Sequence, residues 1–290
     1  MTRAAHHVFD LPVARGVLSL DGRARIMGIL NVTPDSFSDG GEFLDSSAAV
    51  THGLRLAKEG ADILDIGGES TRPGAREISV DEEIKRILPV LTELRRKSDI
   101  PVSIDTRKAA VAEAALDAGA DIINDVSALR HDARMAPLAA ERGVPVVLMH
   151  MQGNPMDMQR HPHYDDVIED LLAFFRRRLE FCEDSGITHA VIDPGIGFGK
   201  KLEHNLSILN HLARLSELQA PLLVGTSRKS FIGQLTGHPA DQRLAGSLAS
   251  NVFAVLNGAH IVRVHDVREM RAALDVIEAI RGKEATRHAV

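Results

Sequence analysis

The apolar run Ile26-Met27-Gly28-Ile29-Leu30 leads directly into Asn31-Val32-Thr33-Pro34-Asp35-Ser36-Phe37-Ser38-Asp39-Gly40-Gly41, and this junction decides the fold. The run has the composition of a buried β-strand. It ends on an amide side chain and continues into Gly, Pro, Asp and Ser, residues typical of surface loops that carry chemistry. The same order of strand, polar end residue, loop and helix recurs along the chain, which indicates an α/β fold.

Eight apolar segments are predicted as strands, and each is followed by a segment of helical periodicity. The strands are near-continuous apolar runs, as expected for a parallel sheet covered by helices. Eight units with a spacing of about 33 residues fit a (β/α)8 TIM barrel. An eight-unit doubly wound sheet is the alternative that the spacing leaves open. The predicted strands are 26–31, 62–66, 102–105, 121–124, 144–150, 190–193, 221–225 and 260–264; the predicted helices are 48–59, 81–96, 108–118, 133–142, 166–183, 204–218, 242–256 and 266–281.

The two ends of the chain are predicted to lie outside the barrel. Val17–Leu20, the dipeptide Asp21-Gly22 and the segment from Arg23 onward predict a β-hairpin with an Asp-Gly turn. We expect this N-terminal extension, residues 1–24, to cover the bottom of the barrel. Residues 282–290 are predicted to form a disordered tail. No linker interrupts the rest, so residues 1–290 are expected to form one domain.

Composition excludes several classes of protein. A formal net charge of −6 argues against a nucleic-acid-binding surface, and aromatic residues at 3% with no Trp leave few side chains on which bases could stack. No apolar stretch is long enough to cross a membrane, and no signal peptide is recognised. Cys182, the single cysteine, rules out a disulfide framework. These features predict a cytoplasmic protein.

Polar residues stand at the end of every predicted strand. One such residue usually caps the following helix or bonds a loop, but a set of eight at one end of a barrel predicts a site. Buried together, they would stay unsatisfied unless a ligand with many polar edges bound among them. The strand-end residues are Asn31, Asp65, Asp105, Asn124-Asp125, His150, Asp193, Thr226–Lys229 and Arg263–His265.

Three of these acids suit a flat heterocycle. The carboxylates of Asp65, Asp105 and Asp193 can accept paired N–H bonds from an amino-pyrimidinone edge, and Asn124 can both donate and accept. Lys229 can donate to the ring carbonyl.

A second group suits phosphate. Arg72, Arg263 and His265 are cationic or able to become so, which favours a diphosphate in a chain whose net charge repels anions. Asn31 supplies a neutral oxygen compatible with Mg²⁺ that keeps most of its waters. The residues therefore predict a heterocycle that carries a diphosphate, with Mg²⁺ as cofactor.

Three other motifs say less about function. Gly195–Lys200 is glycine-rich but matches neither nucleotide-binding pattern, and it is expected to let backbone approach a flat ligand. His161-Pro162-His163 has no third ligand nearby and is interpreted as a solvated loop. Ser227 has no base at a recognisable spacing, which disfavours nucleophilic catalysis.

Long motifs spread from about Met27 to Asp266 resemble those of the dihydropteroate synthase family. The resemblance implies a (β/α)8 barrel, usually dimeric, in folate biosynthesis. It implies that 4-aminobenzoate is joined to 6-hydroxymethyl-7,8-dihydropterin diphosphate with loss of diphosphate, and that sulfonamides inhibit. The motifs are Ile29–Gly41, Asp65–Ala75, Ile104–Thr106, Ile123–Asp125, Met149–Met151, Asp193–Lys200, Ser227–Ser230 and Arg263–Asp266.

The resemblance also implies residue roles. The pterin would be held by Asp105, Asn124, Met149, Asp193, Phe198, Lys229 and Arg263. The diphosphate would be held by Asn31, Thr71, Arg72, Arg263 and His265, with Asn31 on Mg²⁺. The aminobenzoate pocket would comprise Phe37, Thr71, Pro73, Ser227 and Lys229. The residues expected to take part in catalysis are Asp105, Lys229, Arg263 and His265.

The implied reaction needs no strong base, because an aryl amine is already neutral at pH 7. Breaking the carbon–oxygen bond to diphosphate is the difficult step, and the electron-rich dihydropterin favours a dissociative, cation-like transition state. Two alternatives remain: a catalytically silent pterin-binding paralogue, and a pterin-dependent methyltransferase. Small-molecule substrates and a second copy of the chain are the expected partners.

Overall fold

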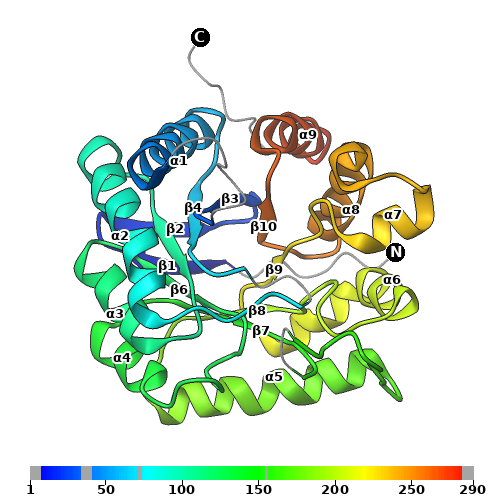
Figure 1. Cartoon of the computed structure of the whole chain (residues 1–290). Helices are drawn as coiled ribbons and strands as arrows, with labels where there is room; N and C mark the ends of the chain where they lie inside the picture. Colours follow the sequence, from blue (N-terminus) through cyan, green and yellow to red (C-terminus); the bar gives the residue numbers. More distant parts are fainter. Residues whose placement is uncertain (1–7, 34–40, 71–73, 154–155, 283–290) are drawn as a thin grey trace.

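Parallel strands form a closed ring at the centre of the molecule (Figure 1). The computed structural model describes residues 8–33, 41–70, 74–153 and 156–282. Within these ranges eight strands follow the order β8-β7-β6-β5-β4-β3-β10-β9, and Ile192 N–H donates to Pro221 O (2.9 Å) to join β8 to β9. The predicted barrel is therefore confirmed over the doubly wound alternative. The strands are β3 Arg25–Asn31, β4 Ile63–Gly67, β5 Val102–Asp105, β6 Ile122–Asp125, β7 Val146–Met149, β8 Ala190–Asp193, β9 Leu223–Val224 and β10 Ile261–Val264.

Helices surround this ring (Figure 1). Gly143, at φ 62°, ends α4 in the left-handed conformation expected just past a helix. The helix predicted over 204–218 is instead α6 and a 3-10 segment that meet at His211, and the short α7 was not predicted. In the described ranges no helix is long and apolar enough to cross a bilayer. The helices are α1 Gly41–Lys58, α2 Val80–Lys97, α3 Ala109–Asp117, α4 Met135–Arg142, α5 Val167–Asp184, α6 Leu202–Asn210, α7 Ser230–Thr236, α8 Leu244–Leu256 and α9 Val267–Ile280, with 3-10 segments η2 Leu212–Leu218 and η3 Ala240–Gln242.

The N-terminal hairpin has a different register from the predicted one. β1 Phe9–Val13 pairs antiparallel with β2 Gly16–Leu20, so the turn lies at Ala14-Arg15, and the prediction of a turn at Asp21-Gly22 was wrong. The turn is anchored to the barrel, because Ala14 N–H donates to Asp121 Oδ1 at 2.7 Å. Asp21-Gly22 instead connects the hairpin to β3.

The hairpin closes the end of the barrel where the strands begin. Leu11 and Leu20 lie in one apolar cluster with side chains from the strands, and every fully buried member is at most 1% exposed. This cluster fills most of the lower half of the barrel interior, where Ser103 of β5 is a buried polar side chain, and the charged side chains lie near the strands' carboxyl ends. The barrel members of this lower layer are Met27, Ile63, Ile122, Val147, Val191, Leu223 and Ile261.

Candidate active site

Two residues above the lower layer, the same strands carry polar side chains. Because successive side chains alternate across a strand, residues i and i+2 face the same side. Ile63, Ile122, Val191 and Ile261 are thus followed inside the barrel by Asp65, Asn124, Asp193 and Arg263. We call these four side chains, with Asp105 at the end of β5, the upper layer.

Arg263 joins the acids of the upper layer across the barrel. Its Nε donates to Asp65 Oδ2 (2.6 Å) and its Nη2 to Asp105 Oδ2 (2.9 Å). Asn124 Nδ2 donates to the same Asp65 oxygen (3.1 Å). The second oxygens, Asp65 Oδ1 and Asp105 Oδ1, are buried and have no hydrogen-bond partner in the described part of the chain. Since buried polar atoms are normally bonded, these two acceptors indicate a ligand with N–H donors.

Burial and charge set the protonation of this cluster. Desolvation raises the pKa of Asp105 to about 7, against the lowering effect of Arg263 and with a further rise from Asp65. Desolvation opposes the charge on Arg263, yet Asp65 and Asp105 hold its pKa above the ordinary value. The guanidinium therefore stays charged, while Asp105 can hold or lose a proton near neutral pH.

Asp193 and Lys229 form the opposite wall. Asp193 Oδ1 accepts from Gly195 N–H (2.7 Å), and burial raises the pKa of this carboxyl. Lys229 Nζ lies 3.9 Å from the centroid of the Phe198 ring, a cation–π distance. Desolvation, then the charge of Arg263, lowers the pKa of Lys229 to about 8, so its ammonium is still charged at pH 7.

The glycines before Phe198 allow this wall to form. A Cβ on Gly195 (φ 67°) would lie 2.0 Å from His150 O, and one on Gly197 would lie 3.2 Å from Lys229 Cδ. Glycine at these two positions therefore lets the segment pack closely against His150 and Lys229, and the approach of its backbone to a flat ligand stays a prediction. Phe198 packs against an apolar cluster that contains Met149, which is 3% exposed.

Ser227 and His265 are a hydrogen-bonded pair. Ser227 Oγ accepts from the backbone N–H of His265 (3.2 Å) and lies 3.0 Å from Nδ1 of the His265 ring. Burial, then the charges of Arg263 and Arg228, lower the pKa of His265 to about 3. A neutral ring that accepts the Ser227 proton at Nδ1 carries its own proton on Nε2. His265 is thus a neutral donor here rather than the cation considered from the sequence, and it is too weak a base to activate Ser227 as a nucleophile.

Asn31 ends β3 beside Asp105. Gly67 lies between them, and a Cβ at that position would be 3.8 Å from both Asn31 Oδ1 and Asp105 Oδ2. Both polar side chains therefore border the same space. The predicted site residues Phe37, Thr71, Arg72 and Pro73 lie outside the described residues.

Two strand-end residues have structural partners instead. Asp125 accepts from Ser127 N–H and Leu129 N–H with its two oxygens, so its carboxylate is satisfied by the protein. His150 packs edge-on against Phe174, with ring centroids 4.8 Å apart, and its Nδ1 lies 3.1 Å from Lys200 Nζ. The expectation that every polar strand end serves one ligand was thus too broad.

A buried ion-pair network beside the site was not predicted. Lys108 Nζ donates to Ile78 O and to Glu83 Oε2, each at 2.7 Å, and it also pairs with Glu69. Arg107 pairs with the other Glu69 oxygen at 2.7 Å. The available signal was positional, because Glu69 and Lys108 each follow neighbouring strand ends by two or three residues.

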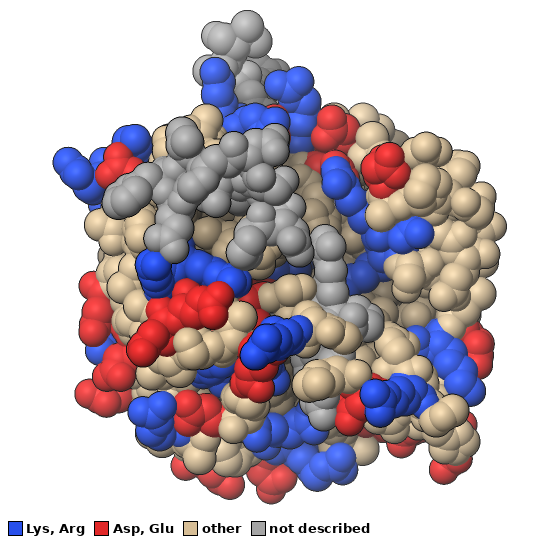
Figure 2. Space-filling view, viewed as in Figure 1, with Lys and Arg blue, Asp and Glu red and all other residues tan. Residues whose placement is uncertain are grey.

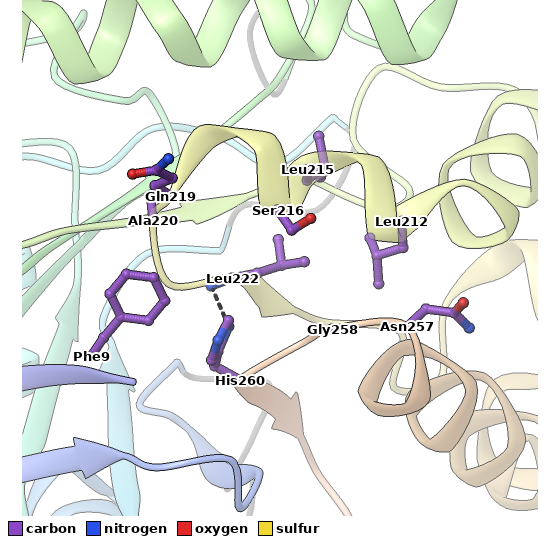
Figure 3. A pocket seen from close by; sticks show the side chains of 10 residues that line it. All are labelled: Phe9, Leu212, Leu215, Ser216, Gln219, Ala220, Leu222, Asn257, Gly258 and His260. Atoms are coloured by element: carbon purple, nitrogen blue, oxygen red, sulfur yellow. Dashed lines mark hydrogen bonds between the residues drawn. The ribbon is translucent and has the colours of Figure 1, made fainter. Parts of the chain in front are cut away.

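A small cavity near the hairpin lies away from the upper layer (Figure 3). It measures about 10 Å³, roughly the space of one water. Phe9 and His260 line it with ring centroids 5.2 Å apart, and Leu222 N–H donates to His260 Nδ1 (3.1 Å). Since these residues precede or begin their strands, the cavity lies at the amino ends and is too small for an organic ligand.

Comparison with known proteins identifies the family. The family model described as "Pterin binding enzyme" matches residues 27–265. The dihydropteroate synthase of Escherichia coli K12 is 48% identical over 274 residues, which cover 93% of this chain and 97% of the relative. This chain belongs to the dihydropteroate synthase family.

Solved structures of the family superpose on the whole barrel. The Xanthomonas albilineans dihydropteroate synthase with 4-aminobenzoic acid has a TM-score of 0.89 at 50% identity, covering 95% of this chain and 99% of that one. The Yersinia pestis dihydropteroate synthase in a sulfonamide complex has a TM-score of 0.89 at 47% identity, covering 94% and 100%. The family resemblance predicted from the motifs is therefore confirmed.

Proposed function

We propose that this chain is a dihydropteroate synthase. It joins the amine of 4-aminobenzoate to the exocyclic carbon of 6-hydroxymethyl-7,8-dihydropterin diphosphate and releases diphosphate. The observation that carries the proposal is the pair of buried carboxylate oxygens, one on Asp65 and one on Asp105, that no described residue bonds. They lie on the upper layer, where a pterin's N–H edge would satisfy them.

The pterin is proposed to lie between the acid cluster and the Phe198 wall. Asn124, Asp105 and Asp193 supply acceptors and an amide for the ring edge, and Lys229 donates to the ring carbonyl. Met149 and Phe198 supply apolar surface for the ring face. Arg263, held by two carboxylates, keeps a fixed orientation over this space.

Departure of diphosphate is proposed to be the slowest chemical step. The carbon–oxygen bond breaks with its electron pair going to the diphosphate, and the neutral aryl amine then attacks the cationic carbon and loses its proton. Arg263 donates two of its five N–H groups to Asp65 and Asp105. Its remaining N–H groups can donate to the oxygens of the departing diphosphate. His265 can donate from Nε2 to the same group. Asp65 and Asp105 stabilise positive charge on the ring.

Asn31 is proposed as the protein ligand of Mg²⁺. Its neutral oxygen borders the same space as Asp105 Oδ2, which suits an ion that takes few protein ligands and otherwise binds water and phosphate. When bound, Mg²⁺ would offset negative charge on the diphosphate. Chelation should weaken binding of pterin diphosphate in calorimetry, and Asn31→Ala should lose most of that metal dependence. Equal affinity with and without Mg²⁺ would contradict this role.

The aminobenzoate is proposed to bind on the side of Ser227 and Lys229. These two residues lie on one turn after β9, and Phe37, Thr71 and Pro73 are the further residues that the family resemblance assigns to the pocket. Sulfonamides, as mimics of the amine, are expected to compete there.

A second copy of the chain is proposed as partner. Large apolar side chains are exposed on α7, α8 and α9, including Leu235 (56%), Leu256 (49%) and Val276 (59%). An area with few charges lies over α7 at the right of Figure 2. Light scattering should give twice the chain mass of 31.5 kDa, and Leu256→Asp should reduce the measured mass; a wild-type monomer would contradict the proposal.

The cytoplasm is proposed as the location. Cys182 is a buried free thiol, and burial raises its pKa to about 11, so it has no role as a disulfide or a reactive thiolate.

Diphosphate release is the experiment that tests the function. Release from dihydropterin diphosphate and Mg²⁺ should require 4-aminobenzoate and should yield dihydropteroate. Arg263→Ala serves as the control for contaminating activity. Tight pterin binding without release would favour the silent paralogue, and no binding would overturn the proposal.

A further inference from the structure

The turn that carries Ser227 and Lys229 has an unusual backbone. Arg228 between them has φ 57°, the left-handed region that favours glycine. A non-glycine residue keeps this conformation only when surrounding contacts hold it there. The contacts of this turn are therefore part of the site's construction.

Ser247 of α8, Arg243 just before α8 and Asp266 just before α9 hold the turn through its backbone and through the Arg228 side chain. Arg228 N–H donates to Ser247 Oγ (2.8 Å), and the Arg228 guanidinium binds both oxygens of Asp266, with Nε at 3.1 Å from Oδ2. Arg243 Nη1 donates to Arg228 O (3.1 Å) and to Lys229 O (3.4 Å). Arg243 thus binds the carbonyls of the two peptide groups that flank the Cα of Lys229.

Gly233 in α7 makes room for the Arg243 side chain. A Cβ on Gly233 would lie 2.2 Å from Arg243 Nη2 and 2.6 Å from Cζ, closer than any real contact. Arg243 Nε donates to His238 O (2.9 Å), which fixes the guanidinium plane. Any larger residue at 233 must therefore push this side chain off the turn.

We propose that Arg243 is a positioning residue for the aryl amine: through the carbonyls of Arg228 and Lys229 it fixes the turn that points Ser227 and Lys229 at the amine. The inference rests on the proposed synthase activity. Arg243 touches no substrate, and its effect passes through the backbone. The pterin depends less on this turn, because Asp105, Asn124 and Asp193 hold it from other strands.

The chemistry of the side chain explains why arginine stands here. A planar guanidinium directs its N–H groups to three carbonyls at once, whereas a lysine ammonium is a compact point donor on a flexible stem. Arg243→Lys should therefore restore part of what Arg243→Ala removes.

Steady-state kinetics of the full chain test the proposal. Arg243→Ala should raise the KM for 4-aminobenzoate about tenfold, the size of losing bonds to a charged donor. The KM for pterin diphosphate should change much less, and Arg243→Lys should lie between the two. Gln242→Ala, an exposed neighbour on η3, is the matched control and should behave as wild type. Urea unfolding shows that each variant is folded under assay conditions.

Gly233→Ala gives an independent route to the same defect. Since it displaces Arg243 without altering it, Gly233→Ala should also raise the KM for the amine, and the double variant Gly233→Ala/Arg243→Ala should be no worse than Arg243→Ala alone. Additive effects, equal changes in both KM values, or wild-type kinetics of Arg243→Ala would overturn the proposal. If Arg243→Ala does not fold, Arg243→Lys carries the same comparison. A wild-type chain that releases no diphosphate with the amine would overturn the proposed function instead.

Discussion

The barrel interior holds two layers of side chains that share their strands and differ in their partners. In the lower layer, Ile63, Val191 and Ile261 are hydrocarbon and at most 1% exposed, and the hairpin leucines complete their packing. Two residues further on, Asp65 and Asp193 are also buried and the Arg263 side chain is 22% exposed, but all three side chains are ionisable. Backbone geometry cannot account for the difference, because the strands continue unbroken from one layer to the next.

The comparison separates stability from function. The lower layer is satisfied by the protein alone, so its substitutions should act on the free energy of unfolding. The upper layer has carboxylate oxygens that the described chain leaves unbonded, so its substitutions should act on binding and turnover. A change that moves a residue's chemistry from one layer into the other tests this division.

Val191→Asp should have the largest effect. It places an unpaired carboxylate among hydrocarbon, which should cost about 4 kcal/mol or more of unfolding free energy. Urea denaturation followed by circular dichroism measures it. The same substitution at the exposed Val17 is the control and should change stability by about 0.5 kcal/mol at most. A stable Val191→Asp chain would mean that the lower layer is not the packed unit described here.

Asp193→Asn should weaken pterin binding by about 3 kcal/mol while leaving the fold intact, since a lost charged acceptor costs this much. The amide keeps an oxygen for Gly195 N–H, so the protein contact survives. Calorimetric titration with pterin measures the affinity. Asp125→Asn is the comparison variant. Both Asp125 oxygens accept from backbone N–H groups of the protein, so this substitution should lower the free energy of unfolding instead. Unfolding of Asp193→Asn would make that residue structural.

Arg263→Ala should cost about 3 kcal/mol of transition-state stabilisation, the size of losing one preorganised charge-stabilising contact. The value follows from kcat/KM for diphosphate release in the presence of the amine. Near-normal turnover would remove Arg263 from the mechanism and leave it as a partner of Asp65 and Asp105 only.

Asp105→Asn should alter the pH dependence of stability. The folded-state pKa of Asp105 is raised to about 7, so the wild type binds the proton more tightly when folded and loses this stability as pH rises from about 4 to 7. The asparagine variant lacks the loss, so its unfolding free energy relative to wild type should rise by up to about 1.4 kcal/mol per pH unit in that window. A difference that stays flat between pH 4 and 7 would contradict the raised pKa.

The sequence predicted most of the fold because the strands are near-continuous apolar runs with polar residues at or near their ends. Strands 102–105 and 190–193 match the structure residue for residue. The hairpin was misplaced because Asp21-Gly22 is the strongest local turn signal, whereas the contact from Ala14 to Asp121 is tertiary. Pro12 also lies inside β1, and a proline within an apolar segment argues against predicting a strand there.

The sequence could predict which strand-end side chains meet inside the barrel, but not their protonation states. The convergence of Asp65, Asp105, Asn124 and Arg263 follows from strand ends alone. The neutrality of His265 depends on burial beside Arg263 and Arg228, which no local pattern reveals. Arg243 lies 14 residues beyond Lys229, between η3 and α8, so only the folded chain brings it to the turn.

The hairpin beneath the barrel also affects how substrates enter the site and how products leave it. With Leu11 and Leu20 sealing the amino ends of the strands, substrates and products share the passage at the carboxyl ends. Dihydropteroate that has formed stands in the place that the next dihydropterin diphosphate must take. We therefore expect accumulated dihydropteroate to compete with the pterin substrate and to slow its binding.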